Sequence, residues 1–187
     1  MGIKTAIHHA AFTVSSIMTT TGYSTVDFQQ WSQFAKTLLL VIMIFGAMAG
    51  STGGGIKTSR ILIVVKSIKV QVRKLLNPRS VKVATLNGKP LDNDVINRTF
   101  LYLSVYAGVV IISFLLVALD NFSMETNLSA VLSCLNNIGP GLDVVGPTSN
   151  YSALSNLSKV VLSFDMLLGR LELLPIFVLF APSTWKS

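Results

Sequence analysis

Long apolar stretches alternate with short polar segments along this chain. Residues 34–50 are almost continuously apolar, with Lys36 placed where its side chain can extend to a membrane interface. A glycine-rich break follows at 51–55, and the apolar pattern resumes over 56–76. Such segments are typical of helices that cross a bilayer, where irregular backbone is tolerated only if it lines a cavity or packs inside protein. The pattern therefore predicts one membrane helix with a break in its middle, rather than two independent helices.

Two further apolar segments predict membrane helices. Residues 99–119 form the clearest span, because an uncharged run of about 20 residues is enough to cross the hydrocarbon core. Residues 152–185 are also apolar. They contain four ionisable side chains, those of Lys159, Asp165, Arg170 and Glu172. Ionisable groups in a span usually face a protein interior or a wet cavity, so these four are functional candidates.

Two segments, 3–23 and 126–142, are too short and too polar to cross a membrane. Each has the pattern of a short helix followed by an extended tip that contains a glycine, Gly22 or Gly139, and each precedes a long apolar helix. This order is what a re-entrant pore loop requires. Either glycine alone could belong to an ordinary turn, but their repetition in equivalent positions favours two pore loops.

Pore loops of this kind have a defined chemistry. A dehydrated potassium ion needs oxygen ligands in place of water, and rings of backbone carbonyls supply them in potassium filters. Residues 20–23, Thr-Thr-Gly-Tyr, are close in pattern to the Thr-Val-Gly-Tyr of such filters. Short helices whose carboxyl ends face the pore would also favour cations through their dipoles. The two segments therefore predict a cation site built from main-chain oxygens.

The charge pattern orients the chain across the membrane. Residues 57–89 carry nine lysines and arginines and no acid, whereas residues 120–151 carry three acids and no base. The positive-inside rule places the first segment in the cytoplasm and the second on the opposite side. Within the basic segment, alternation over 81–86 followed by Asn87 and Gly88 predicts a short β-hairpin.

Several function classes are disfavoured. The formal net charge of +7 falls between apolar stretches without an aromatic and basic recognition pattern, which argues against nucleic-acid binding. One cysteine, Cys134, excludes an intramolecular disulfide and a cysteine metal cluster. His8 and His9 point in different directions on a helix, with no third ligand nearby. A membrane enzyme built on Asp165, Glu172 or the histidines is an alternative, but no nucleophile and base stand at a recognisable spacing.

Four strings of the sequence resemble the Trk/Ktr (TrkH-like) potassium-uptake transporter family, in its last two pore-loop units. They are TTTGYS at 19–24, GSTGGGIKT at 50–58, NNIGPGL at 136–142 and GRLE at 169–172. The resemblance implies an all-α integral membrane fold of repeated membrane-helix, re-entrant pore-loop and membrane-helix units, as in potassium channels, with a small cytoplasmic β-hairpin. Residues 1–76 would hold the pore helix, filter and broken inner helix of the third unit, 77–95 the cytoplasmic connection, and 96–187 the fourth unit.

The same resemblance implies the site residues. The potassium ligands would be the carbonyls of Thr20, Thr21, Gly22, Asn137, Ile138 and Gly139. The gate would be an intramembrane loop beneath the filter, made of Gly46, Gly50, Ser51, Thr52, Gly53, Gly54 and Gly55, although a helix kink for packing would also explain these small residues. Arg170 matches a basic residue that faces the pore below the filter and forms a barrier to ions; an ion pair with Glu172 or Asp165 is the alternative.

The family also implies partners, because four pore loops surround its ion path and this chain supplies two. We expect a truncated part of a transporter, completed by its missing half or by a second copy, in a multi-pass protein of the cell (inner or plasma) membrane. The full protein would form a homodimer that contacts lipid and a cytoplasmic nucleotide-binding regulatory subunit of the TrkA/KtrA kind. Potassium is the substrate and the only metal, and no cofactor is expected. The alternative is a structural membrane subunit that does not transport.

Overall fold

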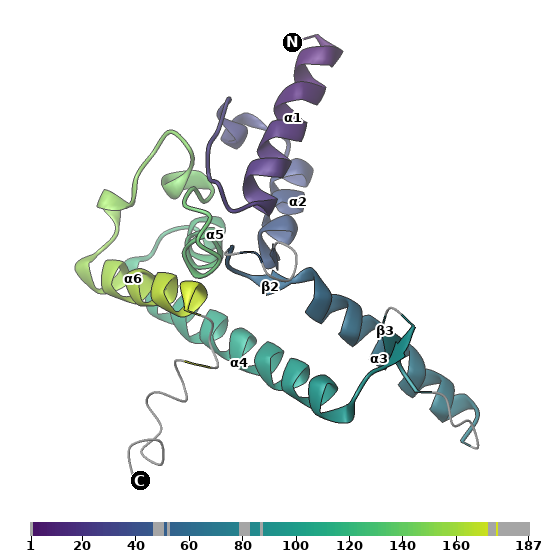
Figure 1. Cartoon of the computed structure of the whole chain (residues 1–187). Coiled ribbons are helices and arrows are strands. Elements are labelled where there is room, and N and C mark those ends of the chain that lie inside the picture. The colour runs from purple at the N-terminus through teal and green to yellow at the C-terminus, as the bar shows by residue number, and fades with distance from the viewer. Residues whose placement is uncertain are drawn as a thin grey trace.

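The computed structural model describes residues 2–46, 51, 53–78, 83–86, 88–171 and 175. Within them the fold is helical (Figure 1). The helices are α1 (Ile3–Met18), α2 (Gln33–Ile44), α3 (Thr58–Leu76), α4 (Asn93–Val117), α5 (Met124–Leu135) and α6 (Asn156–Arg170). Four two-residue strands accompany them, β1 (Phe45–Gly46), β2 (Ile56–Lys57), β3 (Thr85–Leu86) and β4 (Lys89–Pro90).

Side-chain caps fix where several helices begin. Ser32 accepts a hydrogen bond from the Ala35 amide at the start of α2, and Ser123 accepts one from the Thr126 amide at the start of α5. Ser155 caps α6 in the same way. Each serine satisfies an amide that has no partner inside the helix, so these short polar residues set the register of the apolar segments that follow.

Helix α5 lies at the centre of the molecule, between the α1 and α2 pair and the α4 and α6 pair (Figure 1). Its side chains from Thr126 to Leu135 are almost all buried. The corresponding short helix, α1, instead leaves Ile3 and Ile7 exposed over 81% and 63% of their surface. Apolar side chains this open are suited to contact with lipid or with further protein.

The core joins the two halves of the chain. One buried cluster contains Ile17 of α1, Met43 of α2, Leu132 of α5 and Ile138 from the loop after α5. A second cluster, which includes Val117, packs α4 against α5 and α6. Close packing of this kind fixes the two short helices relative to each other.

The apolar segment 34–76 is interrupted between α2 and α3. On either side of the interruption, β1 pairs in parallel with β2, so that Phe45 lies opposite Ile56 and Gly46 opposite Lys57. The Thr58 hydroxyl donates to the Gly46 carbonyl oxygen at 3.3 Å. The two helix ends are therefore held together at the base of the connecting segment.

Strands β3 and β4 pair antiparallel beside α3, with Thr85 opposite Pro90. The Lys66 ammonium of α3 donates to the Thr85 carbonyl oxygen at 2.8 Å, which ties this pair to the helix. Of the alternating segment predicted at 81–86, residues 81 and 82 lie outside the described residues, as does Asn87 of the predicted turn.

Within the described part of the chain, the helical segment Asn93–Asp120 combines the length and apolar character that a bilayer crossing demands. It consists of α4 and the turn that follows it. Helix α2 is apolar but shorter.

Candidate functional site

Two loops with the same main-chain hydrogen bonds follow α1 and α5. After α1, the Thr21 amide donates to the Ser16 carbonyl oxygen at 2.9 Å. After α5, the Ile138 amide donates to the Ser133 carbonyl oxygen at the same distance. In both loops the chain leaves the helix through an equivalent turn.

Side-chain hydroxyls close the two loops in the same way. The Ser16 hydroxyl donates to the Tyr23 carbonyl oxygen at 2.7 Å, and the Ser133 hydroxyl donates to the Pro140 carbonyl oxygen at 2.9 Å. Each serine thus contributes its own carbonyl to the start of a loop and its hydroxyl to the end. The two hydrogen bonds hold the intervening main chain of each loop against the end of its helix.

Left-handed backbone recurs at matching positions. Thr20 and Asn137 have φ values of 56° and 55°, and Gly22 and Gly139 have φ values of 77° and 108°. Residues with a side chain resist this region of φ, whereas glycine enters it without steric cost. The two glycines singled out from the sequence therefore stand where the loop geometry requires glycine.

The two loops touch each other at Gly22. A Cβ atom on Gly22 would lie 2.1 Å from the Ile138 carbonyl oxygen and 3.1 Å from Pro140 Cδ. Around Gly139, in contrast, a Cβ would meet no atom within 4 Å. The backbone of the first loop can approach the second only because position 22 has no side chain.

Tyr151 is hydrogen-bonded to the tip of the second loop. Its hydroxyl donates to the Gly139 carbonyl oxygen at 2.8 Å. Burial raises the pKa of Tyr151 above its ordinary value, so the phenol stays protonated and its O–H remains available as a hydrogen-bond donor. A carbonyl oxygen has two lone pairs, so one remains for another partner. Sequence reasoning missed Tyr151, because nothing local in the sequence connects it to residue 139.

The base of the second loop is attached to α6. The side-chain amide nitrogen of Asn137 (Nδ2) donates to the Met166 carbonyl oxygen at 3.1 Å. Nearby, a Cβ on Gly169 would stand 1.8 Å from the Leu135 carbonyl oxygen. The glycine in the GRLE string thus allows α6 to pass directly against the carboxyl end of α5.

The glycine-rich segment lies directly beneath both loops. A Cβ on Gly54 would stand 2.5 Å from the Asn136 carbonyl oxygen, and one on Gly53 would stand 3.0 Å from Thr20 Oγ1. Gly46, Ser51 and Gly55 complete the described part of the predicted gate, whereas Gly50 and Thr52 lie outside the described residues. The segment packs backbone against backbone, which residues with larger side chains would prevent.

Comparison with known proteins shows which family this chain belongs to. The family model described as TrkH, cation transport protein, matches residues 2–187. The chain belongs to the TrkH family. This confirms the resemblance found in the four strings, and membership in a transporter family supports a location in the membrane.

Relatives of this TrkH-family chain are named as potassium uptake proteins. The Trk system potassium uptake protein TrkH of Salmonella typhimurium is 36% identical over 98% of this chain and 38% of its own length. TrkG of Escherichia coli K12 is 30% identical over 96% of this chain and 36% of its own. The crystal structure of the potassium transporter TrkH from Vibrio parahaemolyticus matches with a TM-score of 0.88 and 33% identity, over 99% of this chain and 39% of that one. The chain thus spans less than two fifths of these relatives.

Arg170 and Asp165 occupy different settings on α6 of this TrkH-family chain. Arg170 is exposed at the carboxyl end of the helix. Asp165 is buried and accepts a hydrogen bond of 2.7 Å from the Ser113 hydroxyl of α4. Asp165 therefore joins α6 to α4. Glu172, the other acid considered beside Arg170, lies outside the described residues.

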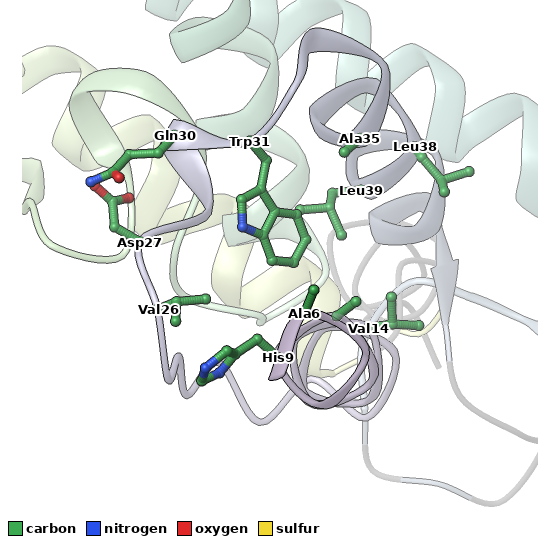
Figure 2. A pocket seen from close by; sticks show the side chains of 11 residues that line it. Ala6, His9, Val14, Val26, Asp27, Gln30, Trp31, Ala35, Leu38 and Leu39 are labelled. Carbon is green, nitrogen blue, oxygen red and sulfur yellow. The ribbon is translucent and has the colours of Figure 1, made fainter. Parts of the chain in front are cut away.

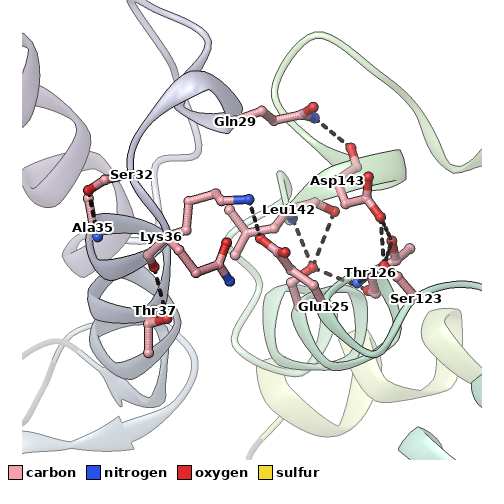
Figure 3. Close-up of polar contacts among 12 residues, drawn as sticks. Gln29, Ser32, Ala35, Lys36, Thr37, Ser123, Glu125, Thr126, Leu142 and Asp143 are labelled. Atoms are coloured by element: carbon pink, nitrogen blue, oxygen red, sulfur yellow. Dashed lines mark hydrogen bonds and ion pairs between the residues drawn. The ribbon is translucent and has the colours of Figure 1, made fainter.

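A polar cluster connects the two halves of the chain near the start of α5 (Figure 3). Lys36 of α2 pairs with Glu125 at 2.9 Å, and Gln29 donates to the Asp143 carbonyl oxygen at 2.5 Å. The Asp143 carboxylate accepts hydrogen bonds of 2.6 Å from the hydroxyls of Ser123 and Thr126. These two hydroxyls lower the pKa of Asp143. Lys36 was predicted to extend toward a membrane interface, and the structure pairs it with Glu125.

A cavity of about 720 Å³ separates α1 from the loop and helix that follow it (Figure 2). Trp31, Val14 and Leu39 supply much of its apolar lining. His9 also lines it and hydrogen-bonds Thr25 Oγ1 through Nδ1 at 2.9 Å. In the described ranges, no three His, Cys, Asp or Glu side chains gather as a metal site. The hydrogen bond between His9 and Thr25 attaches α1 to the segment that follows the first loop.

Proposed function

We propose that this chain supplies two pore-loop units of a potassium transporter and that potassium ions cross the membrane along the face of its two loops. The observation that carries the proposal is the equivalence of the loops: the same hydrogen bonds, the same sequence of left-handed residues, and direct contact at Gly22 and Ile138. Relatives named as potassium uptake proteins support the choice of ion.

The filter in this proposal consists of main-chain oxygens from the two loops. Thr20, Thr21 and Gly22 contribute from the first loop, and Asn137, Ile138 and Gly139 from the second. Carbonyl oxygens replace the water shell of a potassium ion without a fixed charge, which lets the ion leave again. Tyr151 acts as a positioning residue, because its hydroxyl fixes the direction of the Gly139 carbonyl.

The glycine-rich segment is the gate. Its described members, Gly46, Ser51, Gly53, Gly54 and Gly55, lie against the base of both loops, where a small displacement would change the width of the path. Glycine allows this movement because many backbone conformations are open to it. Gly50 and Thr52 belong to the same proposed gate.

Arg170 forms an electrostatic barrier on the path below the filter. A fixed positive charge repels potassium and limits how quickly ions leave, and this effect is strongest where water is scarce. The barrier tunes the rate of transport, whereas the carbonyl oxygens bind the ion.

The complete transporter needs further units. Residues 1–76 act as the third unit, 77–95 as a cytoplasmic connection and 96–187 as the fourth unit of a multi-pass protein in the cell membrane. The exposed apolar face of α1 suits contact with the remaining units or with lipid. The full protein forms a homodimer, and the basic face of α3 binds a cytoplasmic nucleotide-binding regulatory subunit. Potassium is the substrate, and no cofactor or enzymatic activity is involved.

The test is rubidium uptake in cells without their own potassium-uptake systems. A full-length relative whose matching segment is replaced by this chain would be compared with its Gly139→Asp and Gly108→Ala variants. Gly108 lies in α4, where a Cβ meets no atom within 4 Å, so it is a matched control for loss of a glycine. We expect Gly139→Asp to abolish uptake and Gly108→Ala to retain it. Uptake that survives Gly139→Asp at equal membrane insertion would leave only the structural role.

A further inference from the structure

The side chain of Asn136 connects the second loop to the end of α2. Only 1% of its surface is exposed, and its amide nitrogen donates to the Met43 carbonyl oxygen at 2.6 Å. Met43 lies in the last turn of α2, where carbonyl oxygens have no partner inside the helix. Asn136 therefore satisfies a main-chain group that the interruption of the helix leaves open.

Tyr106 of α4 fixes the orientation of this amide. The Tyr106 hydroxyl lies 3.0 Å from Asn136 Oδ1, and both groups are buried. The Met43 carbonyl can only accept, so the amide nitrogen of Asn136 must face it. The amide oxygen then faces Tyr106, whose hydroxyl is the donor. A single asparagine thus connects α4 with the end of α2.

The same residues also touch the far side of the interruption. A Cβ on Gly55 would stand 3.2 Å from Asn136 Oδ1, and the Gly54 backbone packs on the Asn136 main chain. One turn before Tyr106 on α4, the Tyr102 hydroxyl donates to the Gly55 carbonyl oxygen at 3.4 Å. Asn136 therefore contacts both ends of the gate segment, while Tyr106 holds Asn136 and Tyr102 holds the Gly55 end.

Arg60 extends this contact to the start of α3. Its guanidinium lies 3.8 Å from the centre of the Tyr102 ring, and the Tyr102 and Tyr106 rings stack with centres 6.3 Å apart. Cation and aromatic contacts of this kind stabilise most where water is excluded. The start of α3 is thus held by α4 directly, and the end of α2 is connected to α4 through Asn136.

We propose that Tyr106 and Asn136 are positioning residues of the gate, which hold residues 45–46 and 53–57 against the base of the second loop. The inference rests on the proposed gating role of that segment. Displacement of the gate would disturb the hydrogen bond from Asn136 to the Met43 carbonyl and the packing of Gly54 and Gly55 on Asn136, so the pair favours the conformation described here. No reacting group is involved, because the pair acts through the main chain of the gate.

The first readout is hydrogen–deuterium exchange of the purified membrane protein. Tyr106→Phe removes one hydroxyl and keeps the ring, so the fold should persist. Loss of one buried hydrogen bond should raise the equilibrium constant for local opening of the gate segment by about fivefold or more. We expect peptides that contain Phe45, Gly46, Gly54 and Gly55 to exchange faster by this factor, and Tyr102→Phe to act in the same direction with a smaller effect.

Ser113→Ala is the matched control. It also removes a buried hydroxyl of α4, but its partner is Asp165 of α6, away from the interruption. The control should loosen α4 and α6 and leave the gate peptides unchanged. Exchange that rises equally in both variants, or gate peptides that do not respond to Tyr106→Phe, would overturn the proposal.

Transport gives the second readout and separates this inference from the proposed function. In the rubidium assay, Tyr106→Phe should change the maximal rate by at least about threefold and leave the half-saturating concentration within twofold, because the filter is intact. An unchanged maximal rate, or a change confined to the half-saturating concentration, counts against a gate role. Loss of uptake in Gly139→Asp tests the filter independently of either result.

Discussion

The Ile138 carbonyl oxygen lies so close to Gly22 that a Cβ at position 22 would stand 2.1 Å from it. The two residues belong to loops that are far apart in the sequence and have the same hydrogen bonds. Through this contact, the two repeated loops form one structural unit. Its consequences can be tested residue by residue.

Alanine at position 22 should be more harmful than alanine at position 139. Both positions have positive φ, which costs about 1 kcal/mol for a residue with a side chain, but only position 22 adds a collision with main-chain atoms. We expect Gly22→Ala to lower rubidium uptake at least about tenfold and Gly139→Ala to have a smaller effect. Uptake per inserted molecule measures the difference, and equal effects would show that the contact is unimportant.

The paired serines should have equivalent effects. Ser16→Ala and Ser133→Ala each remove a hydroxyl that closes a loop, at a cost of about 1 kcal/mol. The loosened loops should discriminate less well between rubidium and sodium, whereas overall folding is retained. Competition of sodium with rubidium uptake measures this, with thermal unfolding as the control. A selectivity that both single variants leave intact would contradict the role given to the hydroxyls.

Tyr151→Phe should weaken rubidium binding without removing transport. The ring still fills its position, but the Gly139 carbonyl loses the donor that fixes its direction. A several-fold rise in the half-saturating rubidium concentration is expected, from a loss of about 1 kcal/mol. The measurement is a concentration series of uptake at fixed expression. A change in the maximal rate alone would place Tyr151 outside the filter.

The hydrogen bonds of the Asp143 carboxylate should make the stability of the folded protein depend on pH. Hydrogen bonds from Ser123 and Thr126 lower the pKa of its carboxyl below the ordinary 3.8. A lowered pKa in the folded state means that the stabilisation is fully present above about pH 4 and disappears as pH falls through the folded pKa. Asn adopts the positive φ of 56° found at this position, so Asp143→Asn isolates the charge.

The melting temperature of Asp143→Asn should therefore lie below that of the unmodified chain at pH 6. The difference should shrink as the pH is lowered below about 4 and through the folded pKa. Thermal unfolding in detergent at matched ionic strength measures it. A gap that stays constant across this range would show that the carboxylate charge does not contribute.

The sequence predicted helices and loops better than the contacts between them. Uninterrupted apolar runs indicated the long helices, and Gly22 and Gly139 marked the tips of the two loops, because both features depend on local sterics. The partners of Asn136 could not be predicted, since Met43 and Tyr106 lie far from it in the chain. Tyr151 was missed for the same reason. Lys36 was assigned to a membrane interface, because sequence periodicity does not reveal that Glu125 lies opposite it.

The parallel pairing of β1 with β2 has a consequence for how movement passes between the two helix halves. Because Phe45 lies opposite Ile56, the chain leaves α2 and returns to α3 at nearly the same point. A displacement of α3 therefore acts on the end of α2 directly through these paired residues, and does not have to pass through the segment that connects them.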